Sequence, residues 1–418
     1  MVTRDPSCED DFDHASLDCD EARQRIIDHV QTVAGYERVN LRAALDRILT
    51  EPVDSPFNVP PHTNSAMDGY AVRHAELPAS GSGRLKVAGT AFAGKPFLDT
   101  VGPGEAIRIM TGAAMPDDTD TVIMQEHAQA DGTDVLVDAN HKRGQNVRAA
   151  GEDLKAGQRV LEPGHRLGPA ELGIVASLGI GEVSVRRRVR VAYFSTGDEL
   201  RSIGEPLGTG EIYDSNRYTL FAMLRHFGAE IIDMGVVRDT YDDVHNALSL
   251  ASSTADVVIT SGGVSVGEAD YIKAVLADIG EVKFWKVAMK PGRPLAFGSV
   301  GDAVFFGLPG NPVSVMVTFY QFVRPALSKM AGTEETSPVE LTALAGGILK
   351  KRPGRTEFQR GVLSHDEDGR LTVHATGDQG SGILYSMSQA DCFIVLPVEC
   401  ARVEPGTAVQ VQPFSLFM

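Results

Sequence analysis

The sequence has few cysteines, a shortage of basic charge and no long apolar run. Its 418 residues include four cysteines, in two distant pairs without C-x-x-C spacing: Cys8, Cys19, Cys392 and Cys400. This usage argues against structural zinc and disulfides and favours a reduced, cytoplasmic protein. No stretch approaches the roughly 18 consecutive apolar residues that a membrane-spanning helix needs, so we expect no membrane span.

Basic residues are outnumbered by acidic ones. The chain has 39 Lys and Arg against 56 Asp and Glu, a formal net charge of -17, which opposes nucleic-acid binding. The acidic N-terminus lacks the apolar core of a signal peptide, and we expect residues 1–17 to be a disordered leader. In such an acidic protein, a local group of cations is expected to serve a specific anionic ligand.

The length predicts several domains, because one hydrophobic core rarely serves more than about 250–300 residues. Apolar residues recur at helical spacing over residues 18–34, and a second short helix is expected over 41–49. A further helix is expected over Leu167–Leu178, with Pro169 in its first turn. Residues 18–54 and 148–186 together are predicted to form a helical and extended linker domain.

The remaining residues divide into two β-rich regions and one α/β region. Residues 55–147 show short strands and turns, which predict a β-rich domain, either a small barrel or a sandwich. Residues 187–333 alternate strands with helices, typical of a parallel sheet with right-handed crossovers. Residues 334–418 return to short strands and predict a barrel-like C-terminal β domain. The predicted fold class is multidomain α/β plus β.

A glycine-rich turn in the α/β region is the strongest local signal. Val257, Val258 and Ile259 predict a buried strand. A glycine-rich turn that contains Glu268 and Asp270 follows it. Ligands of doubly wound sheets bind at such strand ends, where backbone N–H groups can approach phosphate. Carboxylates at this place suit a metal ion.

Three cations follow within the same region. Lys286 and Lys290 are four residues apart, so on one strand they would share a face, and Arg293 follows in the next turn. Such a group would clamp an anion, although a solvated strand edge is the alternative. Acidic residues that suit a metal ion and basic residues that suit a phosphate therefore occur in one region, which points to chemistry on a phosphorylated small molecule.

Other motifs carry weaker signals when taken singly. Asp68 precedes Gly69 and reads more readily as a plain Asp-Gly turn, and Thr111 follows a strand as a turn residue would. Asp153 lies in GEDL, which is as easily a solvated loop as a site. Asp198 and Glu199 follow a strand end and a glycine, and they would also suit the start of a helix.

Two more motifs lie towards the C-terminus. LPGNPVSV, with Pro309 and Pro312, predicts a rigid turn that feeds a helix N-terminus, which is useful for an oxyanion but also common as structure. RTEFQRG and GSGILYSM supply polar side chains in the last domain: Arg355, Arg360, Ser381 and Ser386.

The joint order of the motifs is more specific than any one of them. The ordered series is NSAMDGYAV, RIMTGA, GEDL, STGDEL, YDSNRY, TSGGVSVGEADY, KVAMKPGRPLAFG, LPGNPVS, RTEFQRG and GSGIL. It closely resembles the pattern of molybdopterin molybdenumtransferases, the family of the bacterial molybdenum-insertion enzymes and of the gephyrin E domain. The resemblance covers residues 18–413, and the acidic leader lies outside it.

The resemblance implies a reaction and a set of partners. Family members insert molybdenum from molybdate into adenylylated molybdopterin and release AMP with the help of a divalent cation, here expected to be Mg²⁺. They form homodimers with the active site between subunits. The expected protein partners are a molybdopterin adenylyltransferase and the apo-molybdoenzymes that receive the cofactor.

The resemblance also assigns roles to residues at matching positions. It implies five catalytic carboxylates, of which Glu199 and Asp270 would hold the metal: Asp68, Asp153, Glu199, Asp239 and Asp270. It implies eleven substrate-binding residues: Thr111, Ser261, Gly262, Gly263, Lys286, Lys290, Arg293, Pro309, Pro312, Arg360 and Ser381. Arg293 departs from the Lys of many family members; it keeps the charge but offers a planar fork.

Two other functions stay open from the sequence. Adenylyl transfer onto molybdopterin is the enzymatic alternative, because the α/β domain resembles that activity as well, although the extra β domains argue against it. A non-catalytic carrier or scaffold paralogue is the alternative of a different class, and the intact acidic and basic motifs speak against it. Tungstate could replace molybdate, since the two oxyanions are alike in size and charge.

Overall fold

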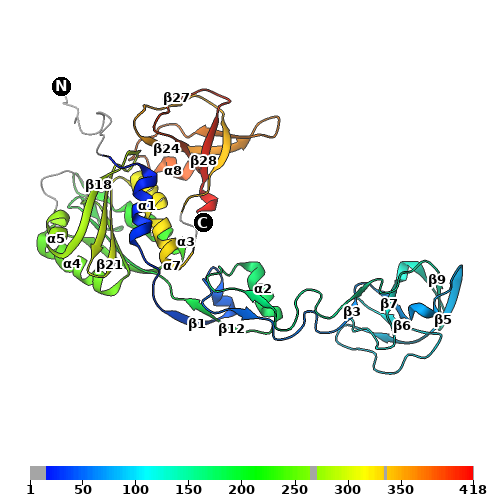
Figure 1. Cartoon of the computed structure of the whole chain (residues 1–418). Coiled ribbons are helices and arrows are strands. Elements are labelled where there is room, and N and C mark those ends of the chain that lie inside the picture. Colours follow the sequence, from blue (N-terminus) through cyan, green and yellow to red (C-terminus); the bar gives the residue numbers. More distant parts are fainter. Residues whose placement is uncertain (1–15, 264–270, 334–336, 418) are drawn as a thin grey trace. The chain divides into compact units, whose positions relative to one another are not determined.

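The computed structural model describes residues 16–263, 271–333 and 337–417 (Figure 1). The chain divides into two compact units. Unit 1 combines Met1–Glu37 with Arg186–Met418, and unit 2 is Arg38–Val185. Residues 1–15 of the predicted leader lie outside the described residues. No helix in the described part of the chain is both long and apolar enough to cross a membrane.

A six-stranded sheet forms the centre of unit 1. Its strands, in spatial order, are β16 (Glu230–Val237), β13 (Arg190–Thr196), β17 (Val257–Ser261), β21 (Ala303–Leu308), β20 (Pro294–Val300) and β18 (Gly280–Lys286). The first four are parallel, as predicted, whereas β20 runs antiparallel to both of its neighbours. Only two residues separate β20 from β21, and so short a connection permits only an antiparallel hairpin.

Both faces of this sheet are buried, which is why its parallel strands read as continuous apolar runs. Val191 and Tyr193 of β13 pack in one cluster with α1 (Cys19–His29), α3 (Ser215–Phe227), α6 (Pro312–Thr318) and α7 (Arg324–Ala331). Ala192 and Phe194 face the opposite cluster with α4 (Tyr241–Thr254) and α5 (Tyr271–Ile279). Figure 1 shows these two helical layers on either side of the sheet.

A closed five-stranded barrel completes unit 1 and confirms the predicted barrel-like C-terminal fold. Its strands pair in a ring, in the order β24 (Thr356–His365), β25 (Leu371–Ala375), β22 (Leu341–Ala345), β28 (Ala408–Pro413) and β26 (Cys392–Leu396), and β26 pairs with β24 again. The short helix α8 (Tyr385–Gln389) precedes β26. Two small ladders, β14 (Leu200–Arg201) with β15 (Ile212–Tyr213) and β23 (Leu349–Lys350) with β27 (Arg402–Val403), lie outside these sheets.

Unit 2 contains one six-stranded sheet. The order is β7 (Thr121–Met124), β4 (Gly69–Val72), β6 (Glu105–Ile109), β5 (Ser82–Ala91), β9 (Asp134–Asp138) and β8 (Ala128–Asp131). Within residues 38–185, all of which are described, no pairing joins the two outer strands, so this sheet is open. Apolar residues pack on both of its faces: Tyr70 and Val72 on one side, Ala71 and Ile107 on the other.

The rest of unit 2 is helical and extended. The predicted helix over Leu167–Leu178 is confirmed as α2 (Pro169–Ser177), with Pro169 in its first turn. Short strands include β2 (Val53–Asp54) paired with β11 (Arg159–Leu161), and β3 (Asn64–Ser65) paired with β10 (Val147–Arg148). The chain passes into and out of the unit through β1 (Tyr36–Asn40) and β12 (Glu182–Arg186).

The predicted helix over residues 41–49 is wrong. Only a 3-10 turn over Leu41–Ala44 forms, capped by the Asn40 side chain, which accepts from the Ala43 N–H at 3.1 Å. Asp46 then takes a left-handed conformation, with φ of 62°, which ends the helical path. The first helix is also shorter than predicted, because Val30 is extended after α1.

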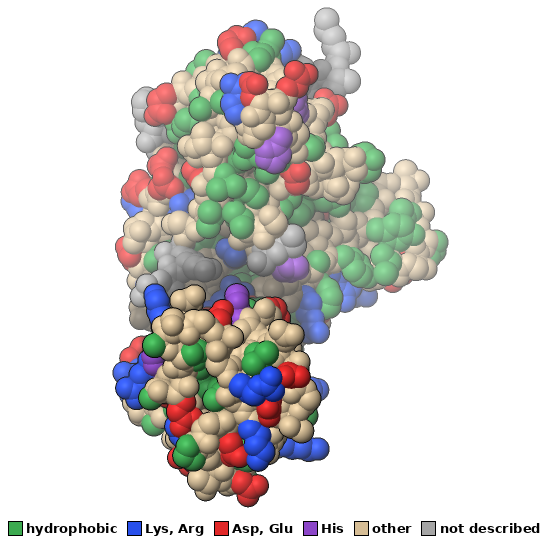
Figure 2. Space-filling view, turned by 90° about the vertical axis from the view of Figure 1, so that its right-hand side faces the viewer, with side chains coloured by type: hydrophobic (Ala, Val, Ile, Leu, Met, Phe, Trp, Pro, Cys, Tyr) green, Lys and Arg blue, Asp and Glu red, His purple; other side chains and the backbone are tan. Residues whose placement is uncertain are grey.

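Charges of both signs are mixed on the sheet surface of unit 2 (Figure 2). Arg84 pairs with Asp131 at 2.6 Å and Asp134 at 3.1 Å, and Lys86 pairs with Glu105 at 3.3 Å. The charges of Arg84 and Lys86 are therefore balanced by neighbouring carboxylates.

We expect the turn after β17 to tolerate only glycine at position 262. The φ of Gly262 is +92°, and a Cβ there would lie 2.7 Å from the carbonyl oxygen of Thr196. Gly262→Ala should therefore lower the free energy of unfolding by about 1–3 kcal/mol, measured from the denaturant midpoint. Gly310→Ala, after β21, is the matched control, because a Cβ there meets nothing within 4 Å. Equal destabilisation by the two variants would contradict this account.

Candidate active site

One edge of the sheet in unit 1 gathers most of the candidate residues. Five strands end there, since β18 runs parallel to β21 across the antiparallel β20. In order along the edge, the strand ends carry Asp239 after β16, Asp198 and Glu199 after β13, Gly262 and Gly263 after β17, Pro309 after β21, and Lys286 on β18. The edge runs from carboxylates to cations over five strand spacings, or about 24 Å.

The glycine turn in the middle of this edge is held by Asn216. The Asn216 side chain in the first turn of α3 donates from Nδ2 to Ser261 Oγ at 2.9 Å and to the Gly310 carbonyl at 2.7 Å. The Gly262 N–H donates to the Leu308 carbonyl at 3.1 Å. Asn216 therefore ties the turns after β17 and β21 together. Asn216 lies within the motif YDSNRY, and the sequence pattern alone does not indicate this role.

The helix N-terminus predicted from LPGNPVSV is confirmed. Pro312 begins α6, and the N–H of Val313 donates to the Ser381 carbonyl at 3.1 Å. Pro309, Pro312 and Ser381 are thus brought to one place from two motifs that are about seventy residues apart in the sequence. The GSGIL loop caps the helix that starts at the sheet edge.

Three carboxylates lie close enough to influence one another at the acidic end of the edge. Partial burial raises the pKa of Asp239, and the negative charges of Asp198 and Glu199 raise it further. The sequence also allowed Asp198 and Glu199 to begin a helix, but they do not. They turn instead into β14, and the Ile212 N–H donates to the Glu199 carbonyl at 2.8 Å.

The donor chemistry of this group suits a hard cation. Mg²⁺ prefers carboxylate oxygens, and a bound cation would relieve the repulsion that raises the pKa of Asp239. Within the described residues, no three Asp, Glu, His or Cys side chains have the geometry of a complete metal site. Asp270, predicted to complete the site, lies outside those residues, as does Glu268.

The cation-bearing segment Lys286–Arg293 crosses from the sheet to the barrel. Lys286 is the last residue of β18, whereas Lys290 lies in β19 (Met289–Lys290), which pairs with β24 of the barrel. The expectation that both lysines share a face of one strand is therefore wrong, because the chain changes sheets between them.

Backbone hydrogen bonds fix this segment on several sides. The Lys286 carbonyl accepts from the Leu17 N–H at 2.8 Å, and the Ala288 N–H donates to the Leu17 carbonyl at 2.7 Å. The Val287 N–H donates to the Arg293 carbonyl at 2.8 Å, which brings the third cation back beside the first. The crossing is therefore held in place before any ligand binds.

Arg360 is more deeply buried than its predicted substrate contact suggests. The residue is 1% exposed, and its guanidinium donates to Ser386 Oγ at 3.0 Å and to the carbonyls of Asp378 and Gly380 at 3.2 and 3.1 Å. Burial lowers its pKa to about 10. In this arrangement Arg360 holds the loop that carries Ser381.

Asp68, Thr111 and Asp153 belong to unit 2, whereas every other described candidate belongs to unit 1. Asp68 Oδ1 accepts from the Thr111 N–H at 2.7 Å and from Thr111 Oγ1 at 2.8 Å. These two hydrogen bonds hold the pKa of Asp68 below its ordinary value. Asp153 is exposed on a turn, and its own backbone N–H donates to the Val59 carbonyl at 3.0 Å.

Thr111→Val should raise the pKa of Asp68, because the hydroxyl donor is lost. The rise should be partial, since the backbone donor, the stronger influence, remains. Because the folded pKa is lowered, the stabilisation by these bonds is present above the unfolded pKa of about 4 and is lost as the pH falls through the folded pKa. Carboxyl ¹³C NMR titration measures the shift. Thr133→Val, which removes a hydroxyl beside Asp134, is the control and should leave the pKa of Asp68 unchanged. An unchanged pKa of Asp68 in Thr111→Val would refute the assignment.

Family models match three parts of the chain. The MoeA N-terminal region (domain I and II) matches residues 17–179, a probable molybdopterin-binding domain matches residues 192–329, and the MoeA C-terminal region (domain IV) matches residues 342–414. Together the matches include the candidate residues of both units.

Whole proteins match over nearly the full length. The molybdopterin molybdenumtransferase of Haemophilus influenzae is 46% identical over 96% of this chain and 99% of its own. Gephyrin of Dictyostelium discoideum is 32% identical over 94% of this chain and 61% of its own. The crystal structure of the molybdopterin biosynthesis MoeA protein of Pyrococcus horikoshii superimposes with a TM-score of 0.82 at 29% identity, covering 95% of this chain and 100% of that one. The chain belongs to the molybdopterin molybdenumtransferase family.

Proposed function

We propose that this protein inserts molybdenum from molybdate into adenylylated molybdopterin and releases AMP. Membership of the family makes it a transferase with a role in molybdenum cofactor biosynthesis. The observation that carries the finer proposal is the charge order along the sheet edge, with carboxylates after β13 and β16, a glycine turn after β17 and Lys286 on β18, from which the chain crosses to Lys290 on β19 of the barrel. A substrate with phosphates and a second, smaller oxyanion needs such groups side by side.

The cations would hold the anionic groups. Lys286, Lys290 and Arg293 are proposed to contact phosphate or molybdate oxygens, because molybdate is a dianion that requires charged donors. The turn Ser261–Gly263 would offer backbone N–H groups to phosphate. Pro309 and Pro312 would keep the neighbouring turn rigid, and Arg360 would act through the loop that presents Ser381.

The carboxylates are proposed to bind the metal ion and to act in catalysis. Glu199 and Asp270 are proposed to hold Mg²⁺, with Asp239 beside them. When bound, the ion would neutralise charge on the phosphoanhydride as AMP leaves. Asp68, kept ionised by Thr111, and Asp153 are proposed to act as catalytic carboxylates from unit 2. The four-domain division given above, a cytoplasmic location and transfer of the product to apo-molybdoenzymes belong to the same proposal.

The test is molybdate-dependent AMP release from adenylylated molybdopterin, with and without Mg²⁺. Lys290→Ala should reduce release by about 100-fold if its charge stabilises the reacting oxyanion. Lys283→Ala is the matched control, because Lys283 is an exposed lysine on the same β18 that ends at Lys286. No molybdate-dependent release by the wild-type protein would refute the function, and full release by Lys290→Ala would remove Lys290 from the site.

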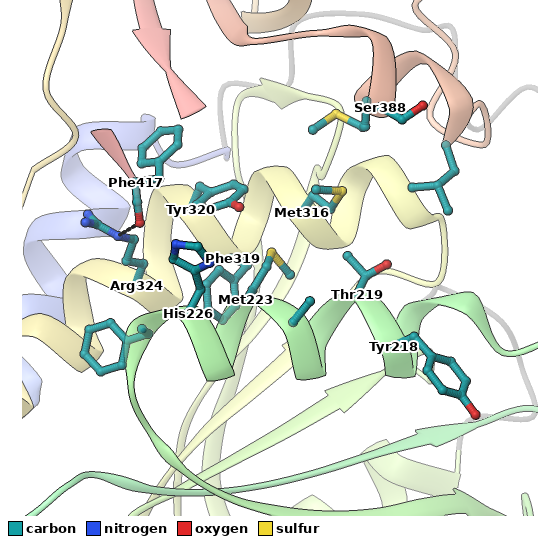
Figure 3. Close-up of a pocket in the computed structure, with 14 residues that line it drawn as sticks. Tyr218, Thr219, Met223, His226, Met316, Phe319, Tyr320, Arg324, Ser388 and Phe417 are labelled. Carbon is teal, nitrogen blue, oxygen red and sulfur yellow. Dashed lines mark hydrogen bonds between the residues drawn. The ribbon is translucent and has the colours of Figure 1, made fainter. Parts of the chain in front are cut away.

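A homodimer is also proposed, and an apolar groove of about 460 Å³ in unit 1 supports it (Figure 3). The groove lies between α3, the α6–α7 segment and α8, and it is lined by Met223, Met316 and Tyr320 among others. Tyr218, which lines the groove, is 45% exposed, and Phe221 on the same helix α3 is 46% exposed. Exposed apolar side chains near an apolar groove are typical of a covered interface.

Phe221→Glu should shift the protein from dimer to monomer, because it places a charge in the proposed interface. Light scattering coupled to size-exclusion chromatography measures the mass. Leu250→Glu is the matched control: it is an exposed apolar residue, 58% exposed, on α4 in the other helical layer. A wild-type monomer, or a Phe221→Glu dimer as stable as the control, would contradict the proposed interface.

A further inference from the structure

The barrel contributes a buried carboxylate to the cation segment. Glu357 lies on β24 directly opposite Lys290 of β19 in the parallel ladder. Glu357 Oε1 lies 3.3 Å from Lys290 Nζ. The Glu357 side chain is 8% exposed, whereas that of Lys290 is 50% exposed. The carboxylate is therefore fixed inside the protein, and the ammonium group reaches from it towards solvent.

Gln359 binds the same carboxylate oxygen as Lys290. Its Nε2 donates to Glu357 Oε1 at 3.0 Å and to the Lys350 carbonyl at 2.8 Å. A short series of contacts therefore runs from the barrel backbone through Gln359 and Glu357 to Lys290. Gln359 is itself 4% exposed, so this series is buried up to the lysine.

The contact with Glu357 restricts a side chain that would otherwise be mobile. Half of the Lys290 side chain is exposed, and a free lysine has many accessible rotamers. A partner that is already buried and hydrogen-bonded restricts that freedom before the ligand arrives, which lowers the cost of binding. Lys290 in return keeps the buried charge of Glu357 paired.

We propose that Glu357 is a positioning residue that fixes the Lys290 ammonium group for the oxyanion of the substrate. The C-terminal barrel thereby takes part in the anion site through β24, although Glu357 itself touches no substrate. This inference rests on the proposed function, because it assigns Lys290 to phosphate or molybdate. The alternative is that Glu357 only balances the buried charge of Arg360, on which its own negative charge acts.

A double-mutant cycle separates the two roles. Glu357→Gln should lower kcat for molybdate-dependent AMP release by about tenfold, as loss of alignment does. In a Lys290→Met background the same substitution should change kcat less than about twofold, because Glu357 acts through Lys290. An equal loss in both backgrounds would overturn the proposal and favour the charge-balancing role.

Two further variants sharpen the test. Glu357→Asp keeps the charge but shortens the side chain by one methylene, so positioning predicts the same loss of kcat as Glu357→Gln, whereas charge balance predicts rescue. Glu404→Gln is the matched control, since Glu404, just after β27 in the C-terminal part of unit 1, forms an exposed pair with Arg402 at 2.7 Å. Wild-type kcat in Glu357→Asp would overturn the proposal even if Glu357→Gln failed to fold.

A structural measurement distinguishes failure of this inference from failure of the proposed function. Crystal structures of the wild-type protein and of Glu357→Asp should show Lys290 Nζ ordered in the first and disordered in the second. That result would support positioning even if the wild-type protein released no AMP. An equally ordered Lys290 in both structures would overturn the positioning role whatever the activity.

Discussion

The anchoring of the Lys286–Arg293 segment between two separate sheets is the constraint on which the candidate site depends. The segment leaves the α/β sheet after Lys286, is bound by the backbone of Leu17, and joins the barrel at Lys290. Both ends are held by hydrogen-bonded ladders. A flexible loop would have to be ordered by its ligand, whereas this segment presents its charges in advance, so that less binding energy is lost to ordering.

The same constraint explains why unit 1 needs both of its folded parts. The parallel sheet supplies an edge where carboxylates, a glycine turn and a helix N-terminus follow one another. The barrel supplies Glu357 beneath one lysine and Arg360 beneath the loop of Ser381. Asp198, Glu199 and Asp239 thus lie towards one end of the edge and Lys286 at the other, while the buried Glu357 pairs with Lys290 where the chain reaches the barrel.

Features that depend on residues within one segment could be predicted from the sequence, whereas features that depend on pairing between distant strands could not. The helix with Pro169 in its first turn and the helix begun by Pro312 could be predicted because turn residues act on their own segment. The spacing of Lys286 and Lys290 could not reveal that the chain changes sheets between them. Glu357 was missed for the same reason, since its partner is 67 residues away and is set by the pairing of β19 with β24.

The most direct test of the account is to locate bound molybdenum. Crystals grown with molybdate and AMP, measured on both sides of the molybdenum absorption edge, give an anomalous peak that marks the metal alone. The account predicts a peak within hydrogen-bonding distance of the side chains of the Lys286–Arg293 segment, lost in Lys290→Ala. A peak elsewhere in a protein that releases AMP would contradict the assignment of this segment as the oxyanion site.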